Sequence, residues 1–380
     1  KAQDPNSPVA AGNVSQKVCT PCHSSLRLSE KYGIESDRFQ TFEASFHGLA
    51  VKGGQVDVAN CASCHGSHDI LPSSDPASTV HPKNLARTCG KCHPGAGERF
   101  AQGKIHVDAS SKTQEPLLWW IGFVYAGLIV GTIGGMFGHN LLDFVKKSKR
   151  HMALRRGEIE EEPAPRRLYV RMTLEERLQH GALALSFIVL VFTGFQLRFP
   201  DSWWAGSFRD VVGSVVSYRS LVHRIAAVVM TLASIYHLYY IVFTVRGRQL
   251  VKDLWFRLKD ARDLVGMLRY NLGLTPVKPK LDRFSYIEKA EYWALIWGTI
   301  VMAGTGGAMW LDNSFMNVFG KLGYDVARSI HYYEAILATL AIIVWHFYFV
   351  IFNPDSYPLN TAFWTGKLSH REMEEEHPLE

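Results

Sequence analysis

The feature that most constrains this chain is an apolar and aromatic stretch from Ser329 to Phe352, which two histidines interrupt. At about 1.5 Å of rise per residue, a helix of this length can cross the hydrocarbon core of a bilayer. His331 and His346 lie fifteen positions apart, so a helix sets them on nearly the same face, roughly 22 Å apart in depth. The stretch therefore predicts a membrane span with one histidine near each surface.

A second apolar stretch, Leu221 to Val245, repeats this arrangement with His223 and His237 fourteen positions apart. One intramembrane histidine alone could simply form a hydrogen bond between helices. Four histidines at matching depths in two spans are what two haems, each with two imidazole ligands, require in a helix bundle. The matched spacing therefore favours haem ligation.

All six cysteines lie before residue 93, in three Cys-x-x-Cys-His motifs. The two thiols of each motif can form thioethers to a haem's vinyl groups, while the adjacent histidine ligates the iron. A zinc or redox Cys-x-x-Cys is disfavoured, because every motif ends in histidine and no spare cysteine is left. The motifs predict three covalent haem c groups, held by Cys19, Cys22, Cys61, Cys64, Cys89 and Cys92, with His23, His65 and His93 as proximal ligands.

The distal ligands of these haems follow by elimination. Residues 1–116 contain no methionine, so ligation by one histidine and one methionine is excluded within this region. Four further histidines are present: His47, His68, His81 and His106. Three haems need three distal ligands, so we expect bis-histidine ligation, low potentials and one spare histidine, His81 or His106.

Charge indicates the orientation of the chain rather than a nucleic-acid partner. The formal net charge of +6 arises from loops beside the predicted spans, above all residues 146–156 and 246–289. Basic loops stay in the cytoplasm, so we expect the N-terminal region in the periplasm and the C-terminus in the cytoplasm, across a bacterial inner membrane. The chain begins at Lys1 without a hydrophobic leader, which suggests a mature product whose export signal has been removed.

The predicted fold class is all-α, with a loop-rich multihaem cytochrome c domain followed by a membrane helix bundle. The bundle is predicted to be a four-helix dihaem cytochrome b core with one extra N-terminal transmembrane helix. The expected segments are a triheme domain at 1–116, a first span at 117–138, a basic linker at 139–177, the four-helix domain at 178–353 and a cytoplasmic tail at 354–380. Within the four-helix domain, an apolar stripe predicts an amphipathic surface helix at about 250–272.

This orientation assigns histidines to the two membrane surfaces. His223 and His331 begin their spans from the outside, so we expect them to ligate an outer haem b. His346 is one ligand of an inner haem b. Its partner is either His180, at the cytoplasmic start of a span, or His237, which the four-turn spacing favours.

From about Arg177 onward, the chain resembles the membrane cytochrome b subunit of formate dehydrogenases and related nickel-iron hydrogenases. The resemblance rests on these pieces: Arg177-Leu-Gln-His180, Phe199-Pro200-Asp201, His223, Tyr292-Trp293, Gly304-Thr305-Gly306 and Ile330-His331. It implies His180 with His346 at the inner haem and His223 with His331 at the outer haem, and it leaves His237 as the alternative. The N-terminal region resembles multihaem c-type cytochromes of respiratory chains, in Ser45-Phe-His47-Gly48 and Cys64-His65-Gly-Ser-His68-Asp69.

The same resemblance implies a quinone site beside the inner haem, at Ser285, Glu288 and Lys289. Independently, Glu334 lies one turn after His331 near the outer surface. Its carboxylate could take protons from a quinol, or it could be an ordinary interfacial side chain.

We therefore expect a b/c-type cytochrome that transfers electrons between quinone, expected to be menaquinone, and a periplasmic cytochrome or oxidoreductase subunit. Such a protein would have quinol:cytochrome oxidoreductase activity and would work in a multi-subunit complex. One alternative is an anchor and relay subunit of a larger respiratory dehydrogenase or reductase. The other is a transmembrane electron conduit that does not use quinone.

Overall fold

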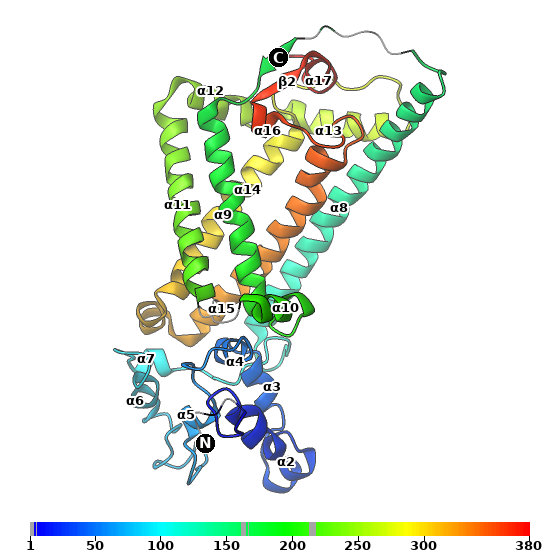
Figure 1. Ribbon diagram of the computed structural model, residues 1–380. Coiled ribbons are helices and arrows are strands. Elements are labelled where there is room, and N and C mark those ends of the chain that lie inside the picture. Colours follow the sequence, from blue (N-terminus) through cyan, green and yellow to red (C-terminus); the bar gives the residue numbers. More distant parts are fainter. Residues whose placement is uncertain (1–3, 5, 161–164, 166, 213–217) are drawn as a thin grey trace. The chain divides into compact units, whose positions relative to one another are not determined.

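The computed structural model describes residues 4, 6–160, 165, 167–212 and 218–380 (Figure 1). The chain forms two compact units that do not follow chain order. The first unit comprises Lys1–Val124, Val189–Ile225 and Gly304–Tyr332. The second unit comprises Tyr125–Ile188, Ala226–Ala303 and Tyr333–Glu380.

The N-terminal region consists of short helices joined by loops. They are η1 (Val14–Cys19), α1 (Thr20–His23), α2 (Leu26–Tyr32), α3 (Arg38–Glu43), α4 (Phe46–Lys52), α5 (Cys61–His65), α6 (Leu85–Gly90) and α7 (Glu98–Ala101). Few hydrophobic side chains are buried among the described residues of this region. Side chains alone therefore build little core here, which suits a region organised around bulky bound groups.

Long apolar helices make up most of the rest of the described chain. Four of them are long and apolar enough to cross a membrane: α8 (Pro116–Arg155), α9 (Leu174–Arg198), α11 (Arg219–Phe243) and the combined stretch Asp312–Phe352. The expected all-α membrane fold is thus confirmed. The fifth expected span coincides with α14 (Tyr286–Trp310), which has 25 residues like α9 and α11 but is diluted by glycine, threonine and tryptophan.

Helix α8 is longer than the span expected at 117–138. It has 40 residues and continues through the basic stretch to Arg155, so the start of the expected linker is helical. Lysine, arginine and leucine are good helix formers, and no glycine or proline interrupts residues 139–155. The polar residues of this extension belong to the second unit, which begins at Tyr125.

The single amphipathic helix expected at about 250–272 is two helices, α12 (Val245–Leu254) and α13 (Leu258–Asn271). Trp255 and Arg257 between them have extended backbones. The Asp260 carboxylate accepts a hydrogen bond from the Arg257 backbone N–H at 2.6 Å and so caps α13. A capping carboxylate three residues into α13 therefore explains the break.

The last apolar stretch is irregular at two places. Gly320 interrupts α15 (Asp312–Ala341) with a φ of 68°, a left-handed conformation that glycine adopts without strain. The wider turns η3 (Ile342–His346) and η4 (Tyr348–Phe352) then replace α-helix around His346. Such turns change the direction of the side chains that follow, so helical periodicity alone does not fix where His346 points.

The C-terminal segment is folded onto the second unit. Strand β1 (Leu168–Val170) pairs with β2 (Lys367–Ser369) in an antiparallel sheet, with Tyr169 opposite Leu368. Helices α16 (Ala362–Thr365) and α17 (His370–Glu376) flank β2 (Figure 1). In the first unit, α10 (Trp203–Val212) follows α9.

Candidate haem sites

Several histidine rings lie in pairs at the separation that a shared metal ion requires. A ligating imidazole nitrogen lies about 2 Å from its metal, so two rings on opposite sides have centres roughly 6 Å apart. Pairs that meet this requirement in the described part of the chain include His47 and His93, with ring centres 6.2 Å apart, His65 and His106, at 6.4 Å, and His180 and His346, at 6.3 Å. Each pair lies within one compact unit. These pairs therefore fit bis-histidine ligation of a haem iron.

His47 and His93 are held by different elements of the first unit. His47 lies in the first turn of α4, which Ser45 caps by accepting a hydrogen bond from the Gly48 N–H at 3.2 Å. A side chain at Gly48 would come within 2.2 Å of a carbonyl oxygen of α3, so only glycine allows this close approach. The His93 Nδ1 is 3.1 Å from the side-chain oxygen of Asn313 on α15.

His65 ends α5, and its partner His106 lies in the loop before α8. The His106 Nδ1 is 3.1 Å from the hydroxyl oxygen of Thr41. The Thr41 hydroxyl donates to a carbonyl oxygen of its own helix at 2.9 Å, so its oxygen accepts from the His106 Nδ1–H. The Nε2 of His106 is then the unprotonated nitrogen that an iron needs.

Burial acts in the same direction on these c-site imidazoles. It lowers the pKa of His47, His65 and His106, because a charged ring loses hydration inside the protein. These rings are therefore neutral at pH 7, which is the form that ligates iron.

Among the described residues, the histidine of the first motif has no equally clear partner. His23 is half-buried, His68 is exposed, and the His81 Nδ1 accepts a hydrogen bond from the Lys83 backbone N–H at 3.2 Å. His106, which we considered a possible spare ligand, lies instead opposite His65. This geometry leaves His68 and His81 as the candidates for the His23 haem.

The expected outer pair, His223 and His331, has matching surroundings on two helices of the first unit. The His223 Nδ1 is 2.8 Å from the Thr193 hydroxyl oxygen, and the His331 Nδ1 is 2.9 Å from that of Thr305. The Thr193 hydroxyl donates to a carbonyl oxygen one turn earlier at 2.6 Å, so it accepts from the His223 Nδ1–H. The Nε2 of His223 is then left to bind a metal.

A glycine follows each of these threonines and lies beside the ring. A methyl group at Gly194 would lie 3.5 Å from His223 Cε1, and one at Gly306 would lie 3.3 Å from His331 Cε1. Glycine at these positions therefore leaves space beside each imidazole ring. The side-chain nitrogen of Gln196, in the same unit, is buried and has no hydrogen-bond partner among the described residues.

Arginines add positive charge to the outer site. The Arg219 guanidinium is 3.5 Å from the Thr193 carbonyl oxygen. Arg224 stacks on Trp310 at 5.3 Å, and Arg198 stacks on Tyr332 at 4.8 Å. Guanidinium groups bind carboxylates well, so this set suits the propionates of a haem.

The expected inner pair, His180 and His346, lies in the second unit. The His346 Nδ1 is 3.4 Å from a carboxylate oxygen of Glu291 on α14, which can only accept the hydrogen bond. The other Glu291 carboxylate oxygen and the Trp345 indole nitrogen are buried without partners among the described residues. These open polar atoms, and the ring separation, fit a haem at His180 and His346.

His237, the alternative inner ligand, has partners for both ring nitrogens. Its Nδ1 is 2.7 Å from the side-chain oxygen of Gln179, and its Nε2 is 3.1 Å from the Tyr292 hydroxyl. A ligand would have to give up one of these hydrogen bonds to bind iron. The structure thus favours His180, which the family resemblance implied, over His237.

The residues expected to form a quinone site lie together at the start of α14, but their polar groups are engaged. The Ser285 N–H donates to Glu288 at 2.7 Å, and the other Glu288 oxygen accepts from Arg171 at 2.8 Å. Lys289 is fully buried, and its ammonium is 2.7 Å from the Asp260 carboxylate. These contacts are those of a helix cap and a buried ion pair.

Glu334, the candidate at the other surface, is buried at 5 % exposure. One oxygen accepts a hydrogen bond from the Tyr125 hydroxyl at 3.1 Å, and the other faces Gly298. The side chain therefore points into the second unit. An exposed interfacial glutamate would instead point toward solvent.

Sequence reasoning did not identify the groups that orient the histidines. They are Thr41, Thr193, Glu291, Thr305 and Asn313. Two of them share one local signal, a threonine followed by glycine inside an apolar helix. The other three have no distinctive local pattern, because each reaches a histidine far away in the sequence.

Comparison with known families covers the membrane part of the chain. Residues 171–359 match the family described as prokaryotic cytochrome b561. No curated protein matches the chain. The matched part contains the apolar helices that carry the five candidate haem b ligands, whereas α8 and the three Cys-x-x-Cys-His motifs precede it. Residues 171–359, just under half of the chain, are therefore similar to a membrane cytochrome b, a class of protein that binds haem b and transfers electrons.

Proposed function

We propose that this protein connects the quinone pool of a bacterial inner membrane to a periplasmic redox partner through two b haems and three c haems. His180 with His346, and His223 with His331, would hold the b haems. The pairs His65 with His106 and His93 with His47 would hold two c haems, and His23 would use His68 or His81. Menaquinone is the expected quinone.

The observation that carries this proposal is the orientation of the histidines. In four of them, His93, His106, His223 and His346, an acceptor oxygen takes the Nδ1–H, so that Nε2 carries the lone pair. Bound haem would supply reversible one-electron transfer at each site. The protein's own groups would fix the tautomer and the angle of each ring and so tune the iron potential.

The structure supports an order of the c haems that runs against the sequence. The loop after the third motif binds the start of α15 through Asn317, which accepts from the Gly97 N–H at 2.9 Å and donates to the Gly95 carbonyl at 3.0 Å. Asn313, one turn earlier on the same helix, contacts the His93 Nδ1. The third c haem would thus lie on the first part of α15, and the part of α15 after Gly320 carries His331 of the outer b haem.

The second and first motifs follow outward from the third. Thr79 donates to the Cys64 carbonyl at 2.6 Å and accepts, through its own carbonyl, from the Thr88 hydroxyl at 2.7 Å, which links the second motif to α6 of the third. The Cys61 N–H donates to Ser15 of η1 at 3.1 Å, which links the second motif to the first. Electrons would therefore leave the outer b haem through the third, second and first c haems in turn.

Quinone chemistry would exchange two electrons and two protons, while each haem site takes one electron at a time. Glu334, with its Tyr125 hydrogen bond, is the candidate for proton exchange on the outer side. Ser285, Glu288 and Lys289 remain the candidates on the inner side, and there a quinone would have to displace one of their existing contacts.

A pyridine haemochrome spectrum with a redox titration of the purified full chain tests this function. We expect three c haems to two b haems, with the b haems reduced first by menaquinol and reduction blocked by an inhibitor that mimics it. The absence of haem b would contradict the proposal for the membrane domain.

Two results would favour an alternative function. Five haems indifferent to quinol would favour a conduit that works without quinone. Copurification of large subunits with molybdenum, nickel or iron-sulfur cofactors would favour an anchor and relay subunit of a larger enzyme.

A further inference from the structure

Helix α8 carries a row of ionisable side chains along one face. His139, Asp143, Lys147 and His151 follow one another at intervals of four, so they lie one above the next. His139 and Asp143 are each only 6 % exposed. Ionisable residues inside an apolar helix are costly and commonly functional. Because α8 lies outside the matched cytochrome b family, this row is an addition to that domain.

Four residues form a continuous chain of contacts, which we call the α8 relay: Asp143, Lys147, Asp355 and His151. The Lys147 ammonium is 3.2 Å from the Asp143 carboxylate and 3.1 Å from the Asp355 carboxylate. The other Asp355 oxygen is 3.0 Å from the His151 Nε2. Hydrogen-bonded groups therefore run without a break from the buried Asp143 to the partly exposed His151.

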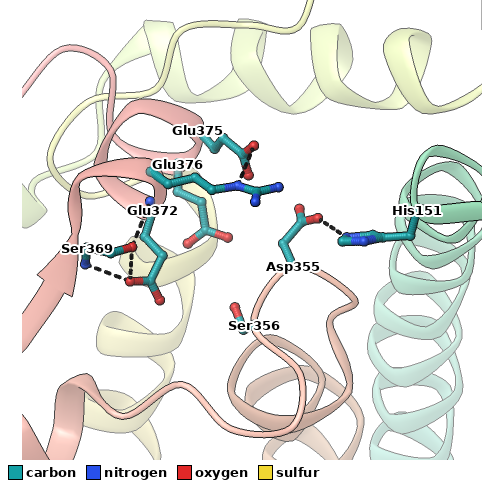
Figure 2. Close-up of a pocket in the computed structure, with 8 residues that line it drawn as sticks. His151, Asp355, Ser356, Ser369, Glu372, Glu375 and Glu376 are labelled. Atoms are coloured by element: carbon teal, nitrogen blue, oxygen red, sulfur yellow. Dashed lines mark hydrogen bonds and ion pairs between the residues drawn. The ribbon is translucent and has the colours of Figure 1, made fainter. Parts of the chain in front are cut away.

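The His151 end of the relay opens into a pocket of about 300 Å³. Figure 2 shows His151 and Asp355 directed toward each other on one side of it, and the α17 carboxylates of Glu372, Glu375 and Glu376 around the other. Burial raises the pKa of Glu376. A polar pocket of this size holds water, so protons can reach His151 and Asp355 from it.

Further charged groups face the relay and set its proton affinity. Lys278 donates to the Glu375 carbonyl at 2.7 Å, and burial together with the Lys147 charge lowers the pKa of Lys278. Arg150 and Arg371 both bind Glu375. Asp143 also faces the Asn271 amide at 3.5 Å. Lys147 pairs with Asp143 and Asp355, and the Glu376 carboxylate adds a third negative charge that acts on it. A cluster with more carboxylates than lysines can bind an additional proton.

The buried end of the relay lies beside the segment that carries His346. The Tyr348 hydroxyl, two residues after His346, donates to Asp143 at 2.7 Å. One turn earlier on α8, the His139 ring lies 5.0 Å from the Trp345 ring, and its Nε2 is 2.7 Å from the Tyr286 hydroxyl. Charge added at His346 would therefore act on Asp143 and His139 through a medium of low dielectric.

We propose that the α8 relay takes up one proton from the pocket when the haem at His180 and His346 is reduced, and returns it when that haem is oxidised. The proposal rests on the inner haem of the proposed function. In the uptake direction, a quinol or an added reductant supplies one electron to the iron. One water-derived proton passes by His151 and Asp355 to Lys147, which gives one of its own protons to the Asp143 carboxylate, so the added charge is balanced.

The test is the pH dependence of the midpoint potential of the inner haem b in the purified full chain. In the unchanged protein, the potential should fall between pH 6 and 9 with the slope of one proton per electron. Asp143→Asn keeps an acceptor for Tyr348 but cannot bind a proton, so the slope should fall to half or less. An unchanged slope with the haem retained would overturn the relay.

Asp325→Asn is the matched control. Asp325 is also buried in a long helix and is paired with a lysine four positions away, Lys321, but it lies in the first unit. It should leave the inner haem's slope unchanged. A loss of slope in this variant too would mean that the change is nonspecific and would also overturn the relay.

A second variant protects the test against misfolding of Asp143→Asn. His151→Gln changes the partly exposed end, and we expect the same equilibrium slope but at least tenfold slower proton uptake, followed with a pH-indicator dye after rapid reduction. Unchanged uptake kinetics would overturn the route through His151. The absence of a b haem would overturn the proposed function and the relay together, whereas a b haem with a pH-independent potential would overturn the relay alone.

Discussion

The two proposed b-haem sites use the same ligand type but hold it differently. At the outer site, neutral threonine hydroxyls contact the Nδ1 atoms of His223 and His331, and arginines lie nearby. At the inner site, the Glu291 carboxylate contacts the Nδ1 of His346. A carboxylate makes the imidazole a stronger base and so favours oxidised iron, whereas nearby guanidinium charge favours reduced iron.

This difference teaches that the direction of electron flow can be set without changing a haem ligand. The inner haem should have the lower potential, so electrons entering there would move downhill to the outer haem and on to the c haems. The buried contacts of the histidines, rather than the histidines themselves, would then determine which way the protein works under given conditions.

The largest expected effect separates the two sites. His346→Ala should remove only the inner haem b, and His331→Ala should remove only the outer one. The protein binds a haem weakly when its iron has lost one of two histidine ligands. The haemochrome ratio should change from three c and two b to three c and one b. The midpoint potential of the remaining b haem identifies which site survives.

His237→Gln provides the control for this pair of variants, because glutamine can keep hydrogen bonds with Gln179 and Tyr292. We expect both b haems to be retained. Loss of the low-potential haem in this variant, with its retention in His180→Ala, would make His237 the inner ligand.

The next effect concerns the size of the potential difference. Glu291→Gln replaces a charged acceptor with a neutral one, so the inner haem's potential should rise by on the order of 60 mV, which corresponds to a tenfold change in the ratio of oxidised to reduced iron. Redox titration with spectral separation of the two b haems measures it.

Two other results would count against the comparison. An equal shift at both haems would indicate a general structural change. A fall in the inner potential would mean that Glu291 does not act on iron through His346.

The sequence predicts those parts of the molecule that contiguous patterns encode. Long apolar runs predicted the membrane helices, because a spanning helix needs about 20 successive apolar residues. The three Cys-x-x-Cys-His motifs likewise predict the residues that would hold haem c, since thioether attachment and ligation by the next histidine require adjacent residues. These predictions needed no knowledge of which helices pack together.

The orienting contacts depend on packing and could not be predicted in this way. Asn313 lies 220 positions from His93, and Glu291 lies 55 positions from His346. The wide turns η3 and η4 also alter the direction of His346 in a manner that regular helical periodicity does not anticipate. The long extension of α8 went unrecognised because its charges indicated a loop.

A smaller effect is expected at the outer site. Thr193→Val and Thr305→Val remove the hydroxyls but keep the shape of the side chain, and a neutral hydrogen bond contributes only about 1 kcal/mol. Each variant should shift the outer haem's potential by about fivefold or less in the redox ratio and should leave the inner haem unchanged. A larger shift here than in Glu291→Gln would reverse the proposed ranking of the two sites.

The acid limit of stability should belong to the second unit. Although burial opposes it, the Lys147 charge and the His151 hydrogen bond lower the pKa of Asp355 below its usual range. A carboxyl with a lowered pKa stabilises the fold above its ordinary pKa of about 4, and this stabilisation is lost as the pH falls through the lowered value. The thermal midpoint of unfolding, followed by the absorbance of the inner haem, falls as the pH decreases below about 4, and this fall should be smaller in Asp355→Asn.

The smallest effect should appear at the alkaline limit of the first unit. Burial disfavours the charged Lys52, but ion pairs with Glu43 at 3.1 Å and Asp201 at 3.3 Å raise its pKa overall. A lysine with a raised pKa stabilises the fold below its ordinary pKa of about 10.4, and this is lost as the pH rises through the raised value. Because Lys52 is partly exposed, Lys52→Met should cost about 1 kcal/mol or less. Thermal midpoints of the c-haem absorbance from pH 8 to 11 test this, and a cost that stays constant above the raised pKa would rule out Lys52 as the titrating group.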